Sequence, residues 1–460
     1  MFTESGFTVI VGAGPTGLTL ARQLDRYRVP YRIVEKSPHP FEGSRGKGLQ
    51  PRTLEVLDDL GLLDRFLTAG SPYPPMRAHL PGGGTRDWRL DEPHEPTAEA
   101  PWPNTLMVPQ WRTGELLADG IPVEYGVGVT AVTQDSVTLD TGEVVEARWI
   151  VGADGGRSTV RKALGIGFEG ETFEEERLLI ADVLVTGLDR EHWHVWPGAD
   201  GRSMGLGLCP LPGTDRFQLT TPPTDRPLAE LVADFDPSIT ITDVGWTTEF
   251  RANIRMVSRY RSGNVFLAGD AAHVHSPAGG QGLNTGVQDA YNLGWKLATG
   301  DDALLDTYEA ERLPVAAGVL GISTRLHRRQ VEEGAEAAMR RDDPALRQLP
   351  LNYRGGPLAA EHRADPGELR AGDRMPDAVL DDGRRLFDVL RGPHATLLAV
   401  GWTGGMPTLP GSVQVRHLAL DTLAGVREEC LLLVRPDGYV GCATTDPRHI
   451  VEYAALIKVR

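Results

Sequence analysis

Cysteine is scarce in this 460-residue chain: Cys209, Cys430 and Cys442 are the only three, and none form a C-x-x-C pair. A sparse, odd set predicts free thiols in a reducing cytoplasm rather than a disulfide framework. Long hydrophobic runs are also missing, since no stretch approaches the ~20 apolar residues of a membrane span. The first strand-like run already begins at Phe7, so no leader is expected. We therefore expect a cytoplasmic protein without a membrane partner.

Basic residues are in the minority, with 47 Lys and Arg against 63 Asp and Glu and a net charge of −16. This balance argues against nucleic acid and anionic membrane surfaces as partners, because both carry negative charge. It favours a small-molecule substrate that is neutral or weakly anionic. The length and a hydrophobic content of 40% allow two or three domains with substantial cores.

A glycine-rich motif, Gly12–Gly17, follows the β-branched run Phe7–Val11 and leads into Thr16–Tyr27, which has apolar residues at helical spacing. In a G-x-G-x-x-G turn the first glycine permits the turn, the second admits a pyrophosphate and the third lets the helix pack on the strand. A second strand, Tyr31–Val34, ends in Glu35, where an acid binds ribose hydroxyls. The pattern predicts a dinucleotide site; a turn without a ligand is the alternative.

Three more segments carry related signals. Asp154–Ser158 follows the apolar strand Trp149–Val151, and Gly269–His273 follows the apolar strand Val265–Ala268. The loop Ser44–Thr53 combines glycines with basic residues, and a helix is expected from its last residue. Such a loop delivers a guanidinium to phosphate oxygens, or it is a solvated basic loop.

Together these segments resemble the class A flavoprotein monooxygenases of the para-hydroxybenzoate hydroxylase fold, in particular the branch that hydroxylates aromatic polyketides and rifamycins. The resemblance rests on the motifs at 12–17, 44–46, 154–158 and 269–273, the last continuing to Asn284. It extends from Phe7 to about His327, with a family-like tail.

The resemblance implies an α/β fold with three parts. A Rossmann-like FAD-binding domain is expected from residues 1–72, 104–170 and 262–335, a mainly antiparallel substrate domain from 73–103 and 171–261, and a small thioredoxin-like C-terminal domain from 370–460. Alternating patterns separated by turns predict strands in the substrate domain; they are Leu178–Leu184, Trp193–Trp196, Met204–Cys209, Phe217–Thr221 and Thr240–Arg251. Residues 340–365 are expected to be a connection. The tail has no C-x-x-C, so a structural or dimer-supporting role is expected there.

The same resemblance implies FAD as cofactor and NADPH or NADH as co-substrate. Asp270 is expected to accept hydrogen bonds from the ribityl hydroxyls, and the backbone of Gly282–Asn284 to lie at the flavin pyrimidine edge, where a helix N-terminus stabilises negative charge. Asp154 and Arg157 are expected near both FAD and nicotinamide, with a helix cap and a surface pair as the alternative. The expected cofactor contacts are Gly12, Gly14, Pro15, Thr16, Gly17, Glu35, Lys36, Arg45, Gln110, Val129, Asp154, Asp270, Pro277, Gly280, Gly282, Leu283 and Asn284.

Two positions depart from the family pattern. The segment Thr113–Ile121 is shorter than the helix usually found there, which leaves the adenosine contacts around Val129 open. Lys47 stands where relatives often carry arginine, and lysine lacks the bidentate fork of a guanidinium. The part of Lys47 in cofactor or nicotinamide binding is therefore left open.

Substrate contacts are expected on the strands between the motifs, with ordinary packing as the alternative for each. Strand alternation puts His192, His194 and Trp196 on one face and Trp193 with Val195 on the other, and either face fits a pocket. The candidates are Trp193, Trp196, Met204, Leu206 and Phe250. The pairs His192/His194 and His273/His275 lack further ligands at metal-binding spacing, so no metal is expected.

The activity that the resemblance implies is hydroxylation of a polycyclic aromatic substrate by O2 through a flavin C4a-hydroperoxide, after reduction of FAD by NAD(P)H. A phenol is already nucleophilic, so no catalytic acid or base is assigned. A halogenase would need Trp-x-Trp-x-Ile-Pro, which the segment 193–197 does not match. Baeyer–Villiger or epoxidising activity, and a flavin-carrying binding protein without turnover, remain alternatives. The substrate, the nicotinamide preference and the choice between monomer and homodimer are left open.

Overall fold

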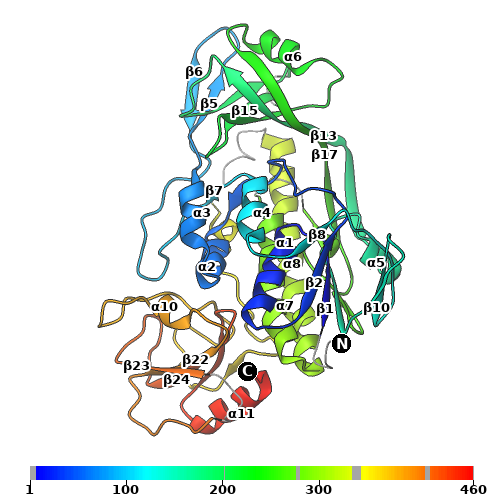
Figure 1. Ribbon diagram of the computed structural model, residues 1–460. Helices are drawn as coiled ribbons and strands as arrows, with labels where there is room; N and C mark the ends of the chain where they lie inside the picture. The colour runs from blue at the N-terminus through cyan, green and yellow to red at the C-terminus, as the bar shows by residue number, and fades with distance from the viewer. Residues whose placement is uncertain (1–6, 201–202, 276–279, 334–342, 410–414, 459–460) are drawn as a thin grey trace.

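The computed structural model describes residues 7–200, 203–275, 280–333, 343–409 and 415–458. Three large sheets succeed one another along the molecule, with six strands in the centre, eight strands at one end and five strands at the other (Figure 1). In the described residues, no helix is both long and apolar enough to cross a membrane.

The central sheet has the order β18-β19-β12-β1-β2-β8, and all its neighbours pair in parallel except β18 with β19. Val9 and Ile10 of β1 are fully buried, as expected for a central parallel strand. Because the parallel strands share one carboxyl edge, the loops after β1, β2, β12 and β19 meet there. The bounds are β1 (Thr8–Val11), β2 (Tyr31–Glu35), β8 (Val123–Tyr125), β12 (Trp149–Gly152), β18 (Arg261–Ser262) and β19 (Val265–Leu267).

Two helices of the central part pack closely against each other, α1 (Pro15–Arg26) and α7 (Gly282–Thr299). Proline at the first position of α1 fits because its missing N–H would have no helical partner. Helix α2 likewise begins at a proline, Pro51, two residues before the predicted start at Thr53. The other helices here are α2 (Pro51–Asp59), α3 (Leu63–Ala69), α4 (Gln110–Ala118), α5 (Thr159–Ala163) and the 3-10 turn η1 (Gly269–Ala271).

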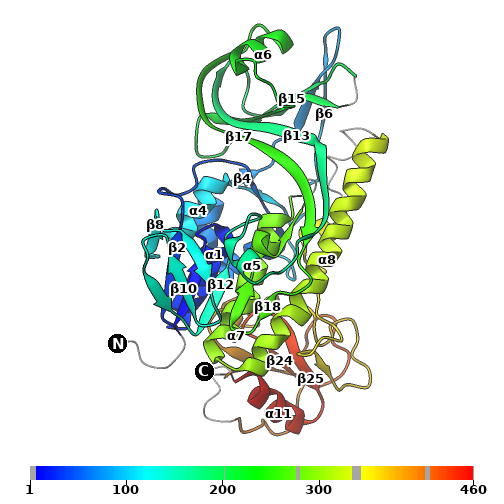
Figure 2. The same cartoon turned by 90° about the vertical axis from the view of Figure 1, so that its right-hand side faces the viewer.

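The eight-stranded sheet is mainly antiparallel, as predicted, and only β14 and β5 pair in parallel. Its long strands β13 and β17 extend from beside the central sheet to the far end of the molecule (Figure 2). Helix α6 (Leu228–Phe235) covers one face, where Phe217 and Leu219 are buried. The strands are β5 (Met76–His79), β6 (Thr85–Trp88), β13 (Glu169–Thr186), β14 (Trp193–Pro197), β15 (Met204–Pro210), β16 (Arg216–Thr221), β17 (Thr240–Met256) and β20 (His273–Val274).

Two three-stranded sheets flank the central part. One has the order β11-β10-β9 and the other β3-β7-β4. Their strands are β3 (Gly48–Leu49), β4 (Ser71–Pro72), β7 (Leu106–Met107), β9 (Val129–Val132), β10 (Ser136–Leu139) and β11 (Val144–Glu146).

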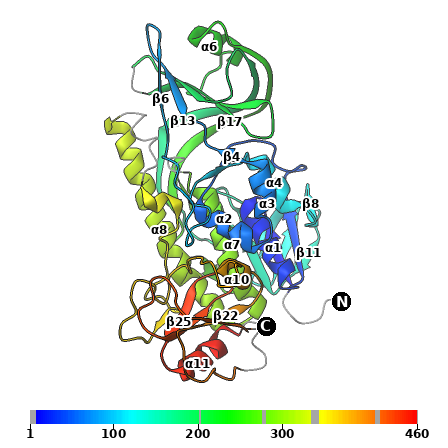
Figure 3. The ribbon, with the colours of Figure 1, turned by 90° about the vertical axis from the view of Figure 1, so that its left-hand side faces the viewer.

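The C-terminal sheet has the order β21-β25-β24-β22-β23, with α11 at the outer end (Figure 3). Its first strand, Ala360–Glu361, lies inside the segment predicted as a connection, so that connection ends earlier than expected. Helix α8 (Asp302–Glu333) runs along the side of the molecule toward the eight-stranded sheet. The remaining elements are η2 (Pro344–Arg347), β22 (Ala395–Val400), β23 (Val415–Leu420), β24 (Cys430–Val434), β25 (Val440–Thr444), α10 (Leu386–Leu390) and α11 (Pro447–Ile457).

Buried ion pairs join the C-terminal sheet to the central helices. Glu311 of α8 accepts hydrogen bonds from Lys296 at 2.7 Å, from Arg435 at 3.0 Å and from Asn292 at 2.9 Å. Arg435 also pairs with Asp437, and all four charged side chains are at most 1% exposed. Because these buried charges compensate one another, the C-terminal sheet and α8 depend on each other for stability.

Candidate functional site

The glycine motifs, far apart in the sequence, are in direct contact. A Cβ on Gly12, whose φ is +105°, would lie 2.4 Å from the Ala153 carbonyl oxygen. A Cβ on Gly269 or on Gly286 would lie 2.4 Å from Oγ1 of Thr16. No side chain fits at these distances, so the first motif packs closely against both later ones. The structure thus brings the three motifs to one edge of the central sheet.

Gly14 differs from these glycines because a Cβ there would meet no heavy atom of the described chain within 4 Å. It is the N-cap of α1 and has an extended backbone with φ of −73°. By contrast, a Cβ on Gly17 would lie 2.0 Å from the Gly12 carbonyl oxygen. Gly17 therefore serves helix packing, whereas Gly14 leaves room at a helix N-terminus, where anions bind.

Glu35 ends β2 beside this turn. Its Oε2 accepts a hydrogen bond from the Ala13 amide at 2.9 Å, and its Oε1 accepts one from the Ser37 amide at 2.9 Å. The carboxylate is thus held at the glycine loop, where a ribose would be bound. The exposed Lys36 lies beside the start of β9, since its Cβ is 3.6 Å from the Cβ position of Gly128. Lys36 and the half-buried Val129, the first residue of β9, therefore border the same end of the site.

The other end of the site lies between η1 and α7. The Asp270 side chain is exposed, and its Oδ1 is 4.0 Å from the Cβ position of Gly282, the first residue of α7. Half-buried Leu283 follows, 3.5 Å from the Cβ position of Gly46. A free carboxylate next to a helix N-terminus can bind hydroxyls while the helix dipole faces an anionic ring edge. Pro277 lies outside the described residues, and Gly280 directly precedes Gln281, the N-cap of α7.

Asn284 and Gln110 hold this end together through their side chains. The buried Asn284 amide accepts a hydrogen bond from the Gln50 amide at 2.8 Å and donates to the Gly48 carbonyl at 2.9 Å. Oε1 of Gln110 accepts a hydrogen bond from the Gly46 amide at 2.8 Å, beside the exposed Arg45. The side chains of Asn284 and Gln110 therefore position the basic loop.

Asp154 has two different carboxylate oxygens. Its Oδ2 accepts hydrogen bonds from the Thr159 amide at 2.6 Å and the Val160 amide at 3.2 Å, which caps α5. Its Oδ1 is buried and has no hydrogen-bond partner among the described residues. Arg157 is exposed. Oδ2 of Asp154 therefore caps a helix, which was the alternative considered from the sequence. Oδ1 remains available to a ligand beside Gly12.

A buried polar network under η1 was not predicted. Asp289 of α7 accepts hydrogen bonds from the Gly269 amide at 3.0 Å and from Nε of Arg312 at 2.7 Å, and it lies 2.7 Å from Nε2 of His273. His273 in turn contacts His275 at 2.9 Å. Burial lowers the pKa of His275 well below its usual value, so His275 is neutral. One feature of the sequence could have indicated this network: a charged residue, Asp289, falls on the buried face of a helix.

Burial separates the substrate candidates into two groups. Trp196 and Leu206 pair across β14 and β15 and pack in the core beneath α6, so ordinary packing describes both side chains. Trp193 and Met204 belong to a different cluster, with Met76 and Tyr73. Phe250 pairs with Leu178, on the face of β13 that also bears Asp182.

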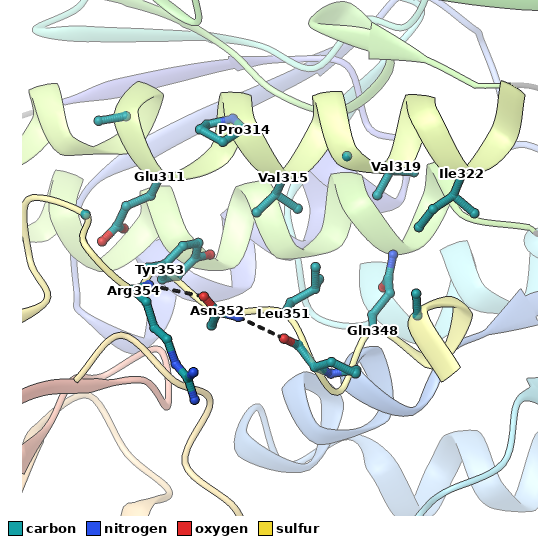
Figure 4. Close-up of a pocket in the computed structure, with 15 residues that line it drawn as sticks. Glu311, Pro314, Val315, Val319, Ile322, Gln348, Leu351, Asn352, Tyr353 and Arg354 are labelled. Carbon is teal, nitrogen blue, oxygen red and sulfur yellow. Dashed lines mark hydrogen bonds between the residues drawn. The ribbon is translucent and has the colours of Figure 1, made fainter. Parts of the chain in front are cut away.

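A separate cavity of about 540 Å³ lies between α8 and the segment 345–356 (Figure 4). Val315, Val319 and Leu351 give it an apolar lining, and Glu311 and Tyr353 contribute polar groups. Its lining residues are distinct from those of the glycine motifs.

These residues fit a dinucleotide that carries a flavin. Gly14 leaves the room a pyrophosphate needs, Glu35 is oriented for a ribose, and Asp270 is exposed beside the α7 N-terminus. The FAD binding domain family matches residues 7–323. The chain therefore belongs to this family of FAD-binding proteins.

Individual relatives indicate which kind of FAD-binding protein this chain is. The chain is 46% identical over 481 residues to a flavin-dependent monooxygenase of Mycobacteroides abscessus, covering 98% of this chain and 99% of the relative. It is 35% identical to a rifampicin monooxygenase of Streptomyces venezuelae over 96% of each chain. The solved anhydrotetracycline hydroxylase of Streptomyces rimosus is similar with a TM-score of 0.68 and 32% identity, over 96% of each chain. This protein is a FAD-dependent monooxygenase.

Replacing Asp270 with alanine is expected to weaken FAD binding about 10- to 100-fold, because hydrogen bonds to a charged group contribute about 1.5–3 kcal/mol. The fold should persist, since the side chain is exposed. Quenching of flavin fluorescence during titration of the apoprotein measures the affinity. Asp225→Ala, at another exposed carboxylate, is the control and should leave the affinity unchanged. Equal affinities of the Asp270 variant and the wild type would contradict the role of Asp270.

Proposed function

We propose that this protein is an NAD(P)H-consuming monooxygenase that hydroxylates polycyclic phenols of the aromatic polyketide type. The observation that carries the proposal is that the start of α7 beside Asp270, where we place the flavin ring, adjoins the loop that contacts the eight-stranded sheet. Relatives named for rifampicin and anhydrotetracycline support this substrate class.

The residues of this chain would bind FAD in an extended form. Gly14 and the α1 N-terminus would hold the pyrophosphate, Glu35 the adenosine ribose and Asp270 the ribityl chain. Bound FAD, with NAD(P)H as the reductant, would supply the oxygen-activating chemistry. The α7 N-terminus would stabilise negative charge on the reduced ring.

The sheet would hold the substrate over that ring. Trp193, Met204 and Phe250 lie on the face opposite α6 and would provide apolar contacts to a planar polycycle. This packing would keep water away from the reacting atoms. Electron-rich phenols need no protein base for attack by their ring carbon, so no residue is assigned that role.

We expect NAD(P)H consumption by the FAD-loaded protein to rise at least tenfold when a suitable polycyclic phenol is added. Mass spectrometry should then detect a product heavier by one oxygen atom, with the ring system intact by NMR. An inserted ring oxygen would indicate Baeyer–Villiger chemistry instead. Tight binding of phenols without any stimulated consumption would overturn the proposal.

A further inference from the structure

The side chain of Lys47, whose part in cofactor or nicotinamide binding the sequence leaves open, reaches the eight-stranded sheet. Its side chain is 9% exposed, and its Nζ donates a hydrogen bond to Oε1 of Gln218 in β16. The same Nζ lies 4.0 Å from the centre of the Trp193 ring, a cation–π contact. The neighbouring Gly46 lies beside Leu283 at the start of α7. Lys47 thus bridges the cofactor side and the sheet.

The face of the sheet around Lys47 is polar where it meets the loop. Gln218 stands opposite Asp182 across β16 and β13, and its Nε2 donates a hydrogen bond to the Ser44 carbonyl. The Ser44 hydroxyl also donates a hydrogen bond to Oδ1 of Asp182. Burial raises the pKa of Asp182, although Ser44 and Lys47 lower it in part. The Asp182 carboxyl and the Lys47 ammonium thus belong to one electrostatically coupled group on this face.

Aromatic and sulfur-containing side chains adjoin this polar group. Tyr73 stacks on Trp193 with ring centres 6.2 Å apart, and the buried Nε1 of Trp193 has no hydrogen-bond partner among the described residues. Met204 lies 3.9 Å from the Thr220 hydroxyl on the same face. A positive charge beside stacking surfaces and an indole donor matches an aromatic ligand that carries an anionic oxygen.

We propose that Lys47 is the specificity-determining residue that binds the ionised hydroxyl of an acidic phenol or enol. This inference rests on the proposed function and specifies its substrate class. In the phenolate the ring is more electron-rich, so a cation that favours ionisation of the bound hydroxyl selects substrates and prepares them for attack. Lys47 acts on the substrate by charge and hydrogen bonding, and no bond to it forms or breaks.

The test uses alizarin, a polycyclic phenol whose visible absorption shifts on ionisation, bound to FAD-loaded protein and titrated with acid and base. At a fixed pH we expect the phenolate-to-phenol ratio of bound alizarin to be at least tenfold higher in wild type than in Lys47→Met. This corresponds to an ionisation midpoint that is lower by at least one pH unit in wild type. Lys47→Arg should retain most of this shift because it retains the charge. Lys458→Met, the same change at the exposed end of α11, should behave as wild type.

Unchanged flavin content and melting temperature would show that Lys47→Met is folded, and Lys47→Gln provides a second neutral variant. The same midpoint in wild type and in both neutral variants would overturn the proposal, as would failure of wild type to bind alizarin. These outcomes are independent of turnover. A Lys47-dependent midpoint without NAD(P)H consumption would refute the proposed function alone, and consumption with a Lys47-independent midpoint would refute only this inference.

Discussion

Changing Gly14 to alanine is expected to abolish FAD binding at ordinary concentrations, with an affinity loss of at least about 100-fold, while the apoprotein stays folded. The added methyl group meets no described atom within 4 Å, and φ of −73° is acceptable for alanine. The methyl group would, however, occupy the space in which a pyrophosphate approaches the backbone amides. Titration of apoprotein with FAD measures the loss, and urea unfolding of the apoprotein measures stability.

Gly114→Ala is the matched control for this change. Gly114 lies in α4, and a Cβ there also meets no described atom within 4 Å. The control should bind FAD normally and gain up to about 1 kcal/mol, because alanine favours a helix over glycine. If Gly14→Ala bound FAD as the control does, the pyrophosphate would have to be placed elsewhere.

Replacing Glu311 with glutamine is expected to lower the free energy of unfolding by about 3–5 kcal/mol, the usual result of leaving a buried charge without its partner. Glu311 is fully buried and contacts both Lys296 and Arg435. Urea unfolding measures the change. The control is Asp234→Asn in the exposed pair with Arg226, for which less than about 1 kcal/mol is expected. A similar small loss for Glu311→Gln would show that the buried network contributes little.

The dependence of stability on pH should show that the charge of Glu311, and not only its packing, stabilises the fold. Burial would raise the pKa of Glu311, but the charges of Arg435 and Lys296 outweigh it and lower the pKa to about 2. A folded-state pKa below the usual 4.5 stabilises the protein fully above pH 4.5, and that stability is lost as the pH falls toward 2. Wild type should therefore lose more stability than Glu311→Gln between pH 5 and pH 3. Parallel losses would contradict this assignment.

The cofactor end of the site was predictable because its residues follow local rules. A turn glycine after a strand, as at Gly12, and an acid at the end of the next strand, as at Glu35, depend on a few neighbouring positions. The structure adds that Gly269 and Gly286, which follow Thr16 by 253 and 270 positions (269 − 16 and 286 − 16), both approach it closely. In the sequence such a long-range contact is marked only by a glycine, which does not reveal the residue that it approaches.

The positions of the substrate candidates were less predictable. Strand alternation assigns side chains to the two faces of a sheet, but it does not indicate which elements cover each face. Trp193 and Trp196 were correctly separated, but only the position of α6 shows that Trp196 is in the core. The direction of Lys47 likewise depends on Gln218, which is 171 positions away. Asp289 was missed because its partners, Gly269 and Arg312, come together only in the folded chain.

The wide spacing of the cofactor residues along the chain has a consequence for synthesis. Gly12 and Glu35 leave the ribosome before the Gly269 turn, which needs Asp289 and Arg312 to hold it. At about 5–20 residues per second, roughly 15 to 60 s separate the synthesis of Gly12 from that of Arg312. Until then the nascent chain carries Gly12 and Glu35 without the completed turn at Gly269. The site proposed for FAD is therefore complete only after Arg312 has been translated.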